Sequence, residues 1–185
     1  MSYAQYRAMA EGERVVLRIL EPADASERYA RWLNDPVVNQ YLETRTASVA
    51  DLRRYIGERD ESSKALFFGI FWKETGEHIG NVKLEPIDTE QRTAVMGMLI
   101  GEKEFWGKGV ATEVTNLIVS FSFDTLGLRE LSLGVLAKNT AARRVYKKCG
   151  FEAYRVEKQS VNHNGTLHDH LFMRKKNNEG EKRSI

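Results

Sequence analysis

Residues 106–111 read Trp106-Gly107-Lys108-Gly109-Val110-Ala111 and stand between an extended apolar run, residues 93–101, and a helical pattern. The apolar residues that follow recur at helical spacing: Val110, Val114, Leu117, Ile118 and Phe121. At such a junction several backbone N–H groups lack an intrahelical acceptor, and glycine lets the backbone approach an anion with positive φ. The stretch therefore predicts a strand, a glycine turn and a helix, where the turn either binds a phosphate group or is simply tight.

The same periodicities extend outward along the chain. Strands are expected over residues 15–20, 65–72, 78–87, 93–101, 130–137, 151–161 and 168–175. Helices are expected over residues 25–33, 49–56, 110–121 and 139–149, with a capping pattern at Ser48-Val49-Ala50-Asp51 and Gly150 just after the last helix. Short polar separators between residues 65 and 101 indicate antiparallel hairpins.

Composition limits the class of protein. A chain of 185 residues with 42% hydrophobic content is enough for one packed domain. The 28 basic and 26 acidic side chains nearly cancel, which argues against nucleic-acid and polybasic membrane binding. Cys149 is the single cysteine, so no intramolecular disulfide or cysteine-based zinc site is expected. With no long apolar run and no signal-peptide pattern, we expect a cytoplasmic protein.

A second informative segment lies farther along the chain than the glycine turn. Its residues Asn139, Ala142, Tyr146, Gly150 and Phe151 lie on or just after the last predicted helix. Together with residues 106–111 they resemble the GNAT superfamily of acetyl-CoA-dependent N-acetyltransferases, whose pyrophosphate loop is Arg/Gln-x-x-Gly-x-Gly/Ala, over residues 14–175. Trp106 replaces the usual Arg or Gln, as in the branch that resembles ribosomal-protein N-terminal and amino-sugar acetyltransferases.

The resemblance implies a fold and an activity. The fold is α/β (α+β), with a mixed, mostly antiparallel seven-stranded sheet that is splayed between the fourth and fifth strands and has helices on both faces. Residues 1–13 would be an N-terminal extension, residues 14–175 the acetyltransferase domain, and residues 176–185 a flexible polar tail. The expected reaction passes an acetyl group from acetyl-CoA to a small-molecule or peptide amine, without a metal. A homodimer is an expected assembly, and a non-catalytic CoA-binding module is the alternative.

The resemblance also assigns residues to the acetyl-CoA site. The backbone amides of the turn would hold the pyrophosphate: Gly107, Lys108, Gly109, Val110, Ala111 and Thr112. Backbone groups of Met98, Leu99 and Ile100 would bind the pantetheine arm as an added strand. Asn139 and Ala142 would contact the same molecule, although Asn139 is also an ordinary N-cap. Tyr146, otherwise a core aromatic, would protonate the departing thiolate.

The reaction also needs a group that takes up the amine's proton. The strand positions at which some relatives carry glutamate are Val95 or Met96 and Gly134 here. Glu102 is the substitute that we assign, with Glu104 and Glu85 as further carboxylates, all three also typical of a solvated surface. A water chain is an alternative. In His168-Asp169-His170, strand alternation separates the aspartate from the two histidines, so we expect no metal and keep a strand histidine as a lesser candidate.

The acceptor is predicted from three further stretches that resemble amino-sugar acetyltransferases of surface-polysaccharide pathways. They are Trp32-Leu33-Asn34-Asp35-Pro36, Tyr41-Leu42-Glu43-Thr44-Arg45 and His78-Ile79-Gly80-Asn81-Val82-Lys83-Leu84. An amino sugar on a nucleotide diphosphate would place its phosphate on Arg45 and its hydroxyls on Glu43 and Asn81, with Glu85 nearby. The alternatives are a local salt bridge for Arg45 and a protein α-amine as the acceptor.

Overall fold

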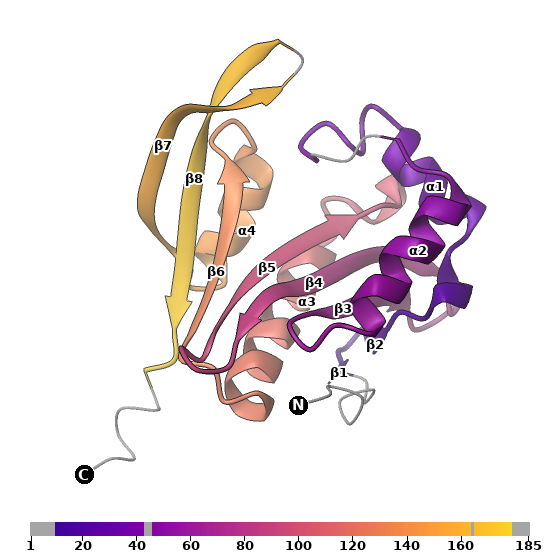
Figure 1. Ribbon diagram of the computed structural model, residues 1–185, viewed down its shortest axis with the longest axis horizontal. Coiled ribbons are helices and arrows are strands. Elements are labelled where there is room, and N and C mark those ends of the chain that lie inside the picture. The colour runs from indigo at the N-terminus through magenta and orange to yellow at the C-terminus, as the bar shows by residue number, and fades with distance from the viewer. Residues whose placement is uncertain (1–9, 43–45, 164, 179–185) are drawn as a thin grey trace.

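The computed structural model describes residues 10–42, 46–163 and 165–178, which form one eight-stranded sheet and four α-helices (Figure 1). The strands are β1 (Ala10–Glu11), β2 (Val15–Ile19), β3 (Leu66–Trp72), β4 (His78–Asp88), β5 (Thr93–Ile100), β6 (Glu130–Leu136), β7 (Glu152–His163) and β8 (Thr166–Lys176). The α-helices are α1 (Glu27–Asn34), α2 (Val49–Asp60), α3 (Val110–Ser120) and α4 (Thr140–Lys148). Short turns of other helix types cover Pro22–Asp24, Lys103–Phe105 and Phe121–Thr125.

The sheet has the order β1-β2-β3-β4-β5-β6-β8-β7 and is antiparallel except between β5 and β6. The predicted fold class is confirmed, with one more strand than the seven expected. The addition is β1, in which Ala10 pairs with Leu17 and Glu11 with Val16. Two residues are too few to show a period of two, so only the pairing with β2 identifies this strand. The fourth and fifth predicted strands are therefore β5 and β6.

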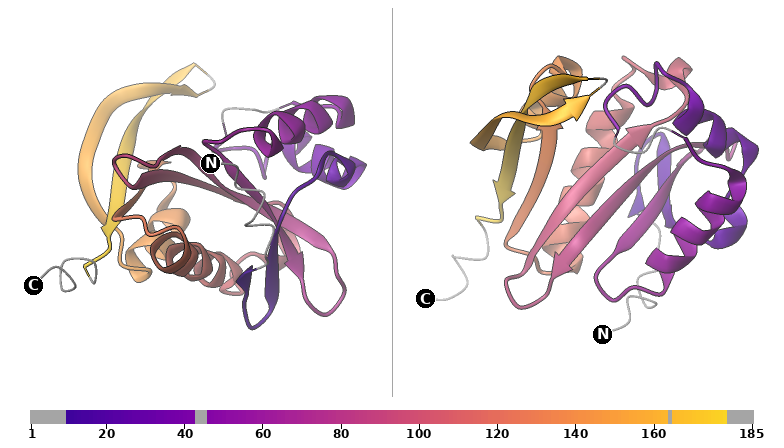
Figure 2. Two further views of the ribbon diagram at one scale, coloured as in Figure 1. Left: turned by 60° about the horizontal axis from the view of Figure 1, so that its bottom comes forward. Right: turned by 45° about the horizontal axis from the view of Figure 1, so that its top comes forward.

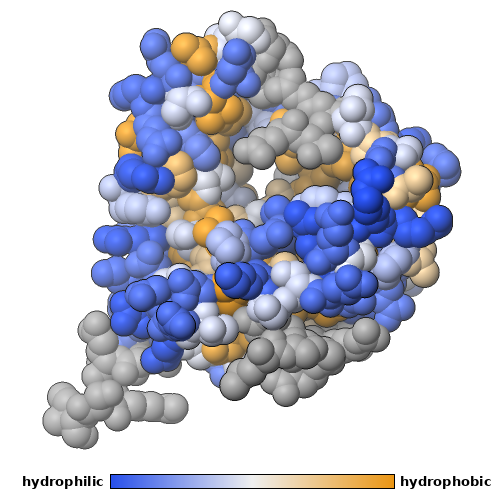
Figure 3. Space-filling view, viewed as in Figure 1, coloured by the Kyte–Doolittle hydropathy of each residue, from blue (hydrophilic) through white to orange (hydrophobic). Residues whose placement is uncertain are grey.

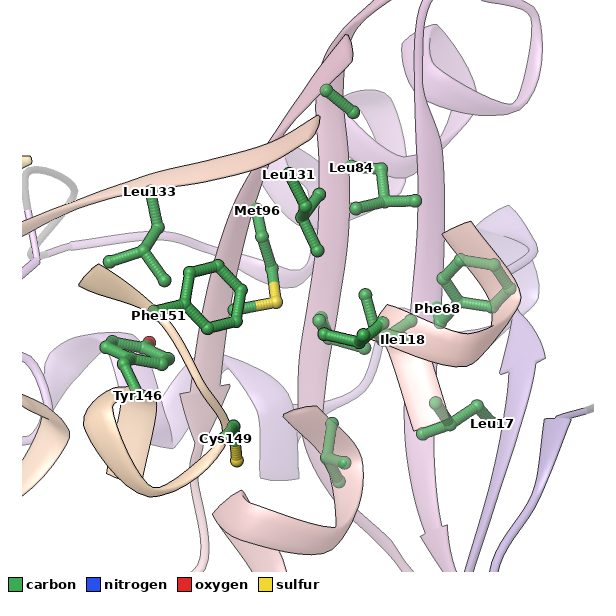
Figure 4. Close-up of a cluster of buried hydrophobic side chains, with 14 of the residues drawn as sticks. Leu17, Phe68, Leu84, Met96, Ile118, Leu131, Leu133, Tyr146, Cys149 and Phe151 are labelled. Atoms are coloured by element: carbon green, nitrogen blue, oxygen red, sulfur yellow. The ribbon is translucent and has the colours of Figure 1, made fainter. Parts of the chain in front are cut away.

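Helices cover both faces of the sheet, as expected (Figure 2). On one face α1 and α2 pack on Leu20 and Phe67, in a cluster that includes the buried Trp32 and Ile56. On the other face α3 and α4 cover a larger core built from the inward side chains of the central strands (Figure 4). None of the helices in the described ranges has the length and apolar character needed to cross a membrane.

Two local signals in the sequence produce the helix ends that they predict. Ser48 Oγ accepts a hydrogen bond from the Asp51 backbone N–H at 3.1 Å, and Asp51 Oδ2 accepts one from the Ser48 backbone N–H at 3.0 Å, which is the reciprocal capping box. Gly150 follows α4 with φ of 84°, a conformation that L-residues with a Cβ rarely adopt. These ends fix where the connections to the sheet begin.

The central feature of the sheet is the divergence of β5 from β6. These parallel strands pair only where Thr93, Ala94 and Val95 face Glu130, Leu131 and Ser132. Beyond that point β5 stays paired with β4 as far as Ile100, and β6 stays paired with β8 as far as Leu136. Each strand is thus held by its outer neighbour, while its inner edge pairs with no strand of the described residues. Figure 1 shows the two strands opening away from their common end. We call this gap the splay.

At the open end of the splay, α1 docks on β5 through an indole against a glycine. A Cβ built on Gly101 would lie 2.0 Å from Trp32 Cδ2, and Trp32 is only 3% exposed. The indole Nε1 donates a hydrogen bond to Glu102 Oε1 at 3.0 Å. The position of α1 therefore depends on the absence of a side chain at residue 101.

We predict that Gly101→Ala lowers the free energy of unfolding by about 1–3 kcal/mol, because the added methyl group must displace a buried indole. Urea denaturation measures the change. Gly97→Ala is the matched control on the same strand, since its Cβ would only contact the flexible Lys83 side chain at 3.4 Å and should leave the midpoint nearly unchanged. Equal midpoints for Gly101→Ala and the wild type would contradict this packing.

Candidate active site

The glycine turn between β5 and α3 has the predicted backbone geometry. Gly107 and Gly109 have φ of 73° and 82°, and Gly109 is the N-cap of α3. A Cβ on Gly107 would meet no atom within 4 Å, and one on Gly109 would meet only the Arg14 guanidinium, at 3.4 Å. The turn thus presents bare backbone to open space. A ligand can approach this surface as closely as a phosphate requires.

The first turn of α3 offers N–H groups to such a ligand. The backbone N–H groups of Thr112 and Glu113 both donate to the Gly109 carbonyl at 3.1 Å. Val110 and Ala111 precede them in the first turn, where no intrahelical acceptor exists for their N–H groups. These amides and the positive end of the helix dipole fit an anion such as a pyrophosphate.

This turn is held in place by an ion pair that the sequence did not predict. Arg14, just before β2, donates from Nε to Glu113 Oε2 at 2.8 Å and from a guanidinium nitrogen to the Lys108 carbonyl. Burial acts to raise the pKa of Glu113, but hydrogen bonds from Arg14 and Val15 outweigh it and lower the pKa. The pair joins residues 99 positions apart, so no local pattern in the sequence could have indicated it.

The free edge of β5 contains the residues expected to bind the pantetheine arm. Met98 and Ile100 pack toward the core under α3 and α4, whereas Leu99 packs toward α1 and α2. Trp106, which replaces the Arg or Gln of the expected motif, donates from Nε1 to the Ile100 carbonyl at 2.9 Å. This hydrogen bond occupies the last carbonyl group of β5. The peptide groups of Met98 and Leu99 lie on the part of β5 that runs along the splay.

Tyr146 is placed under β6 by α4. Figure 4 shows its ring beside Phe151, with a centroid distance of 5.9 Å, on the same side of the sheet as Leu133. Its side chain is 7% exposed, and burial, with a smaller effect of Cys149, raises the pKa of the hydroxyl to about 12. The structure gives this hydroxyl no hydrogen-bond partner among the described residues. It is therefore a protonated donor at neutral pH.

Asn139 and Ala142 make local contacts at the start of α4. Asn139 Oδ1 accepts a hydrogen bond from the Ala142 N–H at 3.1 Å, which is the ordinary N-cap interaction. The half-buried Ala142 packs against the larger core. These contacts position the helix that carries Tyr146.

Two of the three carboxylates considered for the amine's proton, Glu102 and Glu85, are held by other side chains. Glu102 accepts from Trp32 and lies 3.6 Å from an Arg28 nitrogen. Glu85 accepts from Arg59 Nε at 3.0 Å and from Lys83 Nζ at 3.1 Å. Glu104 is exposed on the short turn before Trp106.

The face of β4 toward α1 and α2 brings together Asn81 and Glu85, with Lys83 between them. Asn81 is 4% exposed; its Oδ1 is 2.8 Å from His78 Nε2, and its Nδ2 has no partner among the described residues. Lys83 Nζ donates to the Tyr55 hydroxyl at 3.1 Å. Glu43 and Arg45, the other two predicted acceptor residues, lie outside the described residues.

A basic pair that the sequence did not point to lies at the open end of the splay, which we call its mouth. Lys138 follows β6, and its Nζ lies 2.9 Å from His168 Nε2 on β8. The same Nζ is 5.9 Å from the ring of Tyr41, so Tyr41 reaches the mouth from the opposite side. Figure 3 shows the surface hollowed here, with an opening between the two sides.

Strand alternation separates His168 and His170 from Asp169, as the sequence predicts. Asp169 accepts from Lys158 Nζ at 2.8 Å and from the Gln159 backbone N–H at 3.0 Å. The residues described by the structure contain no group of three or more metal-binding side chains.

Comparison with known proteins gives a consistent result. The sequence profile of the Acetyltransferase (GNAT) domain matches residues 14–152. The Bacillus subtilis protein YjcK, described as a probable N-acetyltransferase, is 31% identical over 173 residues, which cover 89% of this chain and 95% of YjcK. The spermidine N(1)-acetyltransferase of Escherichia coli K12 is 37% identical over 76 residues, 41% of this chain and 40% of that protein.

A solved structure agrees over nearly the whole fold. The spermidine N-acetyltransferase from Vibrio cholerae in complex with CoA and spermine has a TM-score of 0.81 and 25% identity, covering 88% of this chain and 95% of that one. The splayed sheet, the glycine turn at the start of α3 and these similarities lead to one conclusion. The chain belongs to the GNAT acetyltransferase family and is an acyltransferase with acetyl-CoA as its donor.

Proposed function

We propose that the protein acetylates the primary amine of an anionic acceptor, namely an amino sugar carried on a nucleotide diphosphate. The observation that carries this proposal is the basic pair of Lys138 and His168 at the mouth of the splay. The described residues place no carboxylate within ion-pair distance of Lys138. A phosphate of the acceptor would therefore meet a lysine ammonium where it enters.

Side chains of β4 on the α1–α2 face of the sheet also suit an anionic, hydroxylated acceptor. The Lys83 side chain covers Gly97 of β5, and although burial acts to lower its pKa, Tyr55 and Glu85 outweigh burial and raise the pKa, so it is a cation. Asn81 Nδ2 is a buried donor without a partner among the described residues, and a sugar hydroxyl would satisfy it. Arg45 and Glu43 stay in the proposal as the phosphate and hydroxyl contacts inferred from the sequence.

Spermidine acetyltransferases are among the similar proteins, which makes a polyamine the main competing acceptor. A polycation would require carboxylates free to pair with its ammonium groups. Glu85 and Glu102 are instead held by Arg59, Lys83 and Arg28. The described charges thus favour the anionic acceptor.

The proposed mechanism uses both faces of the splay. The amides of residues 107–112 hold the pyrophosphate, and the free edge of β5 aligns the pantetheine arm, so that the thioester lies between the strands. The amine attacks the thioester carbon from the α1–α2 face; a C–N bond forms and the C–S bond then breaks. A backbone N–H of β5 stabilises the oxyanion, and Tyr146 donates its proton to the departing sulfur.

We predict that Gly109→Val weakens CoA binding at least tenfold, because a β-branched side chain at positive φ blocks the approach of the pyrophosphate to the backbone. Isothermal titration with CoA measures the affinity, and circular dichroism confirms the fold. Gly76→Val is the control, since Gly76 also has positive φ but lies on the β3–β4 hairpin. A folded Gly109→Val protein with wild-type affinity would refute the assignment of the turn.

We predict that Tyr146→Phe retains CoA binding but loses about 100- to 10,000-fold in kcat, because only the hydroxyl that protonates the thiolate is removed. Thiol release from acetyl-CoA gives the rate, and the CoA affinity of the same protein gives the control. A loss of less than about threefold, with chemistry shown to be rate-limiting, would make Tyr146 a core residue only.

For the acceptor, we predict that a 4-amino sugar nucleotide has a higher kcat/KM than N-terminal peptides or spermidine. Lys138→Ala should raise the KM for that acceptor about tenfold, the effect of losing one charge-assisted contact, and should leave the KM for an amine without a phosphate group unchanged. Arg45→Ala should act in the same direction. Faster turnover of peptides or spermidine, with no effect of either substitution, would contradict the proposal.

A further inference from the structure

We infer that His170 on β8 is the catalytic base that takes the proton from the acceptor's ammonium group. This assignment rests on the proposed function, since it requires an amine acceptor on the α1–α2 face of the splay. The sequence suggested a strand histidine only as one of several options, and the structure distinguishes His170 from the others.

The imidazole of His170 lies over β6, the strand that borders one side of the splay. His170 pairs with Leu136, yet a Cβ built on Gly134 would lie 2.4 Å from its Nε2 and 2.8 Å from its Cε1. The ring therefore lies directly against the backbone of β6 beyond the last residue that pairs with β5. Because Gly134 has no side chain, the imidazole occupies the space beside its Cα.

The ring is on the opposite side of the sheet from Tyr146. Leu133 and Val135 face the core that contains Tyr146, and alternation directs Gly134 and Leu136 to the other face. That is the face on which His168 lies beside Lys138, whose Nζ is 5.9 Å from the Tyr41 ring. A base on this face would act on the incoming amine, and the hydroxyl acid on the other face would act on the departing thiolate.

His170 has ring nitrogens available for a ligand. Its described interaction is the contact with the Phe172 ring, at a centroid distance of 4.3 Å. By contrast, His78 Nε2 is engaged by Asn81 and His168 Nε2 by Lys138. Among the histidines whose side chains the structure describes, His170 is thus the one whose Nε2 lies against β6 beside the splay and has no hydrogen-bond partner among the described residues.

The charged groups around His170 come from its neighbours in the sheet. On β7, Glu157 is its register partner and forms an ion pair with Arg155 at 3.2 Å, while Arg155 also stacks on Phe172. On β8, His168 lies two residues away beside Lys138, and Arg174 lies farther along the same face. β6 contributes the uncharged Gly134 and Leu136.

The proposed step is a balanced proton transfer. The acceptor's ammonium gives one proton to His170 Nε2, and the resulting neutral amine attacks the thioester carbon. After attack the nitrogen loses a second proton, which replaces the one that Tyr146 gives to the sulfur. The products are the amide and the thiol, and the proton on His170 returns to solvent. Imidazole suits this role because it exchanges protons near neutral pH.

The test is the pH dependence of kcat/KM for the acceptor in His170→Ala. We expect a loss of about 100- to 10,000-fold at neutral pH and loss of the acidic limb of the profile, with unchanged CoA affinity and thermal unfolding. Added imidazole should restore part of the rate. His168→Gln, the neighbouring histidine on the same face, should instead raise the acceptor's KM and keep the acidic limb.

A second variant tests the position of the ring. Gly134→Ala places a methyl group where the imidazole lies, so it should lower kcat in the wild type by displacing the base. In the His170→Ala background the same change should have almost no effect, because there is no ring to displace. Thermal unfolding of the same variants is the control: non-additivity in kcat without matching non-additivity in the unfolding midpoint assigns the effect to the reaction rather than to folding.

The outcomes separate this assignment from the proposed function. If the wild type acetylates an amine but His170→Ala keeps kcat/KM within threefold and an unchanged acidic limb, His170 is not the base, while the proposed function stands. If imidazole fails to rescue and Gly134→Ala acts equally in both backgrounds, the assignment is also overturned. A wild type that turns over none of the amines would refute both.

Discussion

The arrangement of the whole site depends on how short the pairing between β5 and β6 is. Three residue pairs join these parallel strands, and beyond Val95 and Ser132 each strand is held only by its outer neighbour. Because β4 and β8 draw the strands apart, the inner edges are free to bind another extended chain. The same divergence gives access to both faces of the sheet at one point, which group transfer between two bound molecules requires.

The glycine turn would bind an anion poorly if its backbone could move. The Arg14–Glu113 pair fixes the turn against the start of β2, and the guanidinium adds positive charge beside Gly109. Helices α3 and α4 also pack on one shared apolar core. Close packing in this core keeps one helix from shifting relative to the other. The proposed anion site is thus preorganised by contacts that lie outside the motif itself.

The two faces of the splay have different chemical character. The α3–α4 face is apolar and holds Tyr146 in its protonated form, since burial raises the pKa of the hydroxyl. The opposite face contains histidine, lysine and amide groups: His170, Lys138, Lys83 and Asn81. In the proposed mechanism, the Tyr146 hydroxyl on the apolar face gives a proton to the thiolate, and the His170 imidazole on the polar face takes one from the amine.

By itself the sequence determined the helices, seven of the strands, the positive φ of the glycine turn and the caps at Ser48, Asn139 and Gly150, because these depend on neighbouring residues. Only the tertiary structure decided which side chains have partners. Glu102 is held by Trp32 and Arg28, Glu113 by Arg14, and His168 by Lys138, across separations of 30 to 99 residues. Strand β1 likewise exists only through its pairing with β2. Such contacts follow from sheet register and helix docking, whose free energy comes from many distant residues and leaves no local pattern.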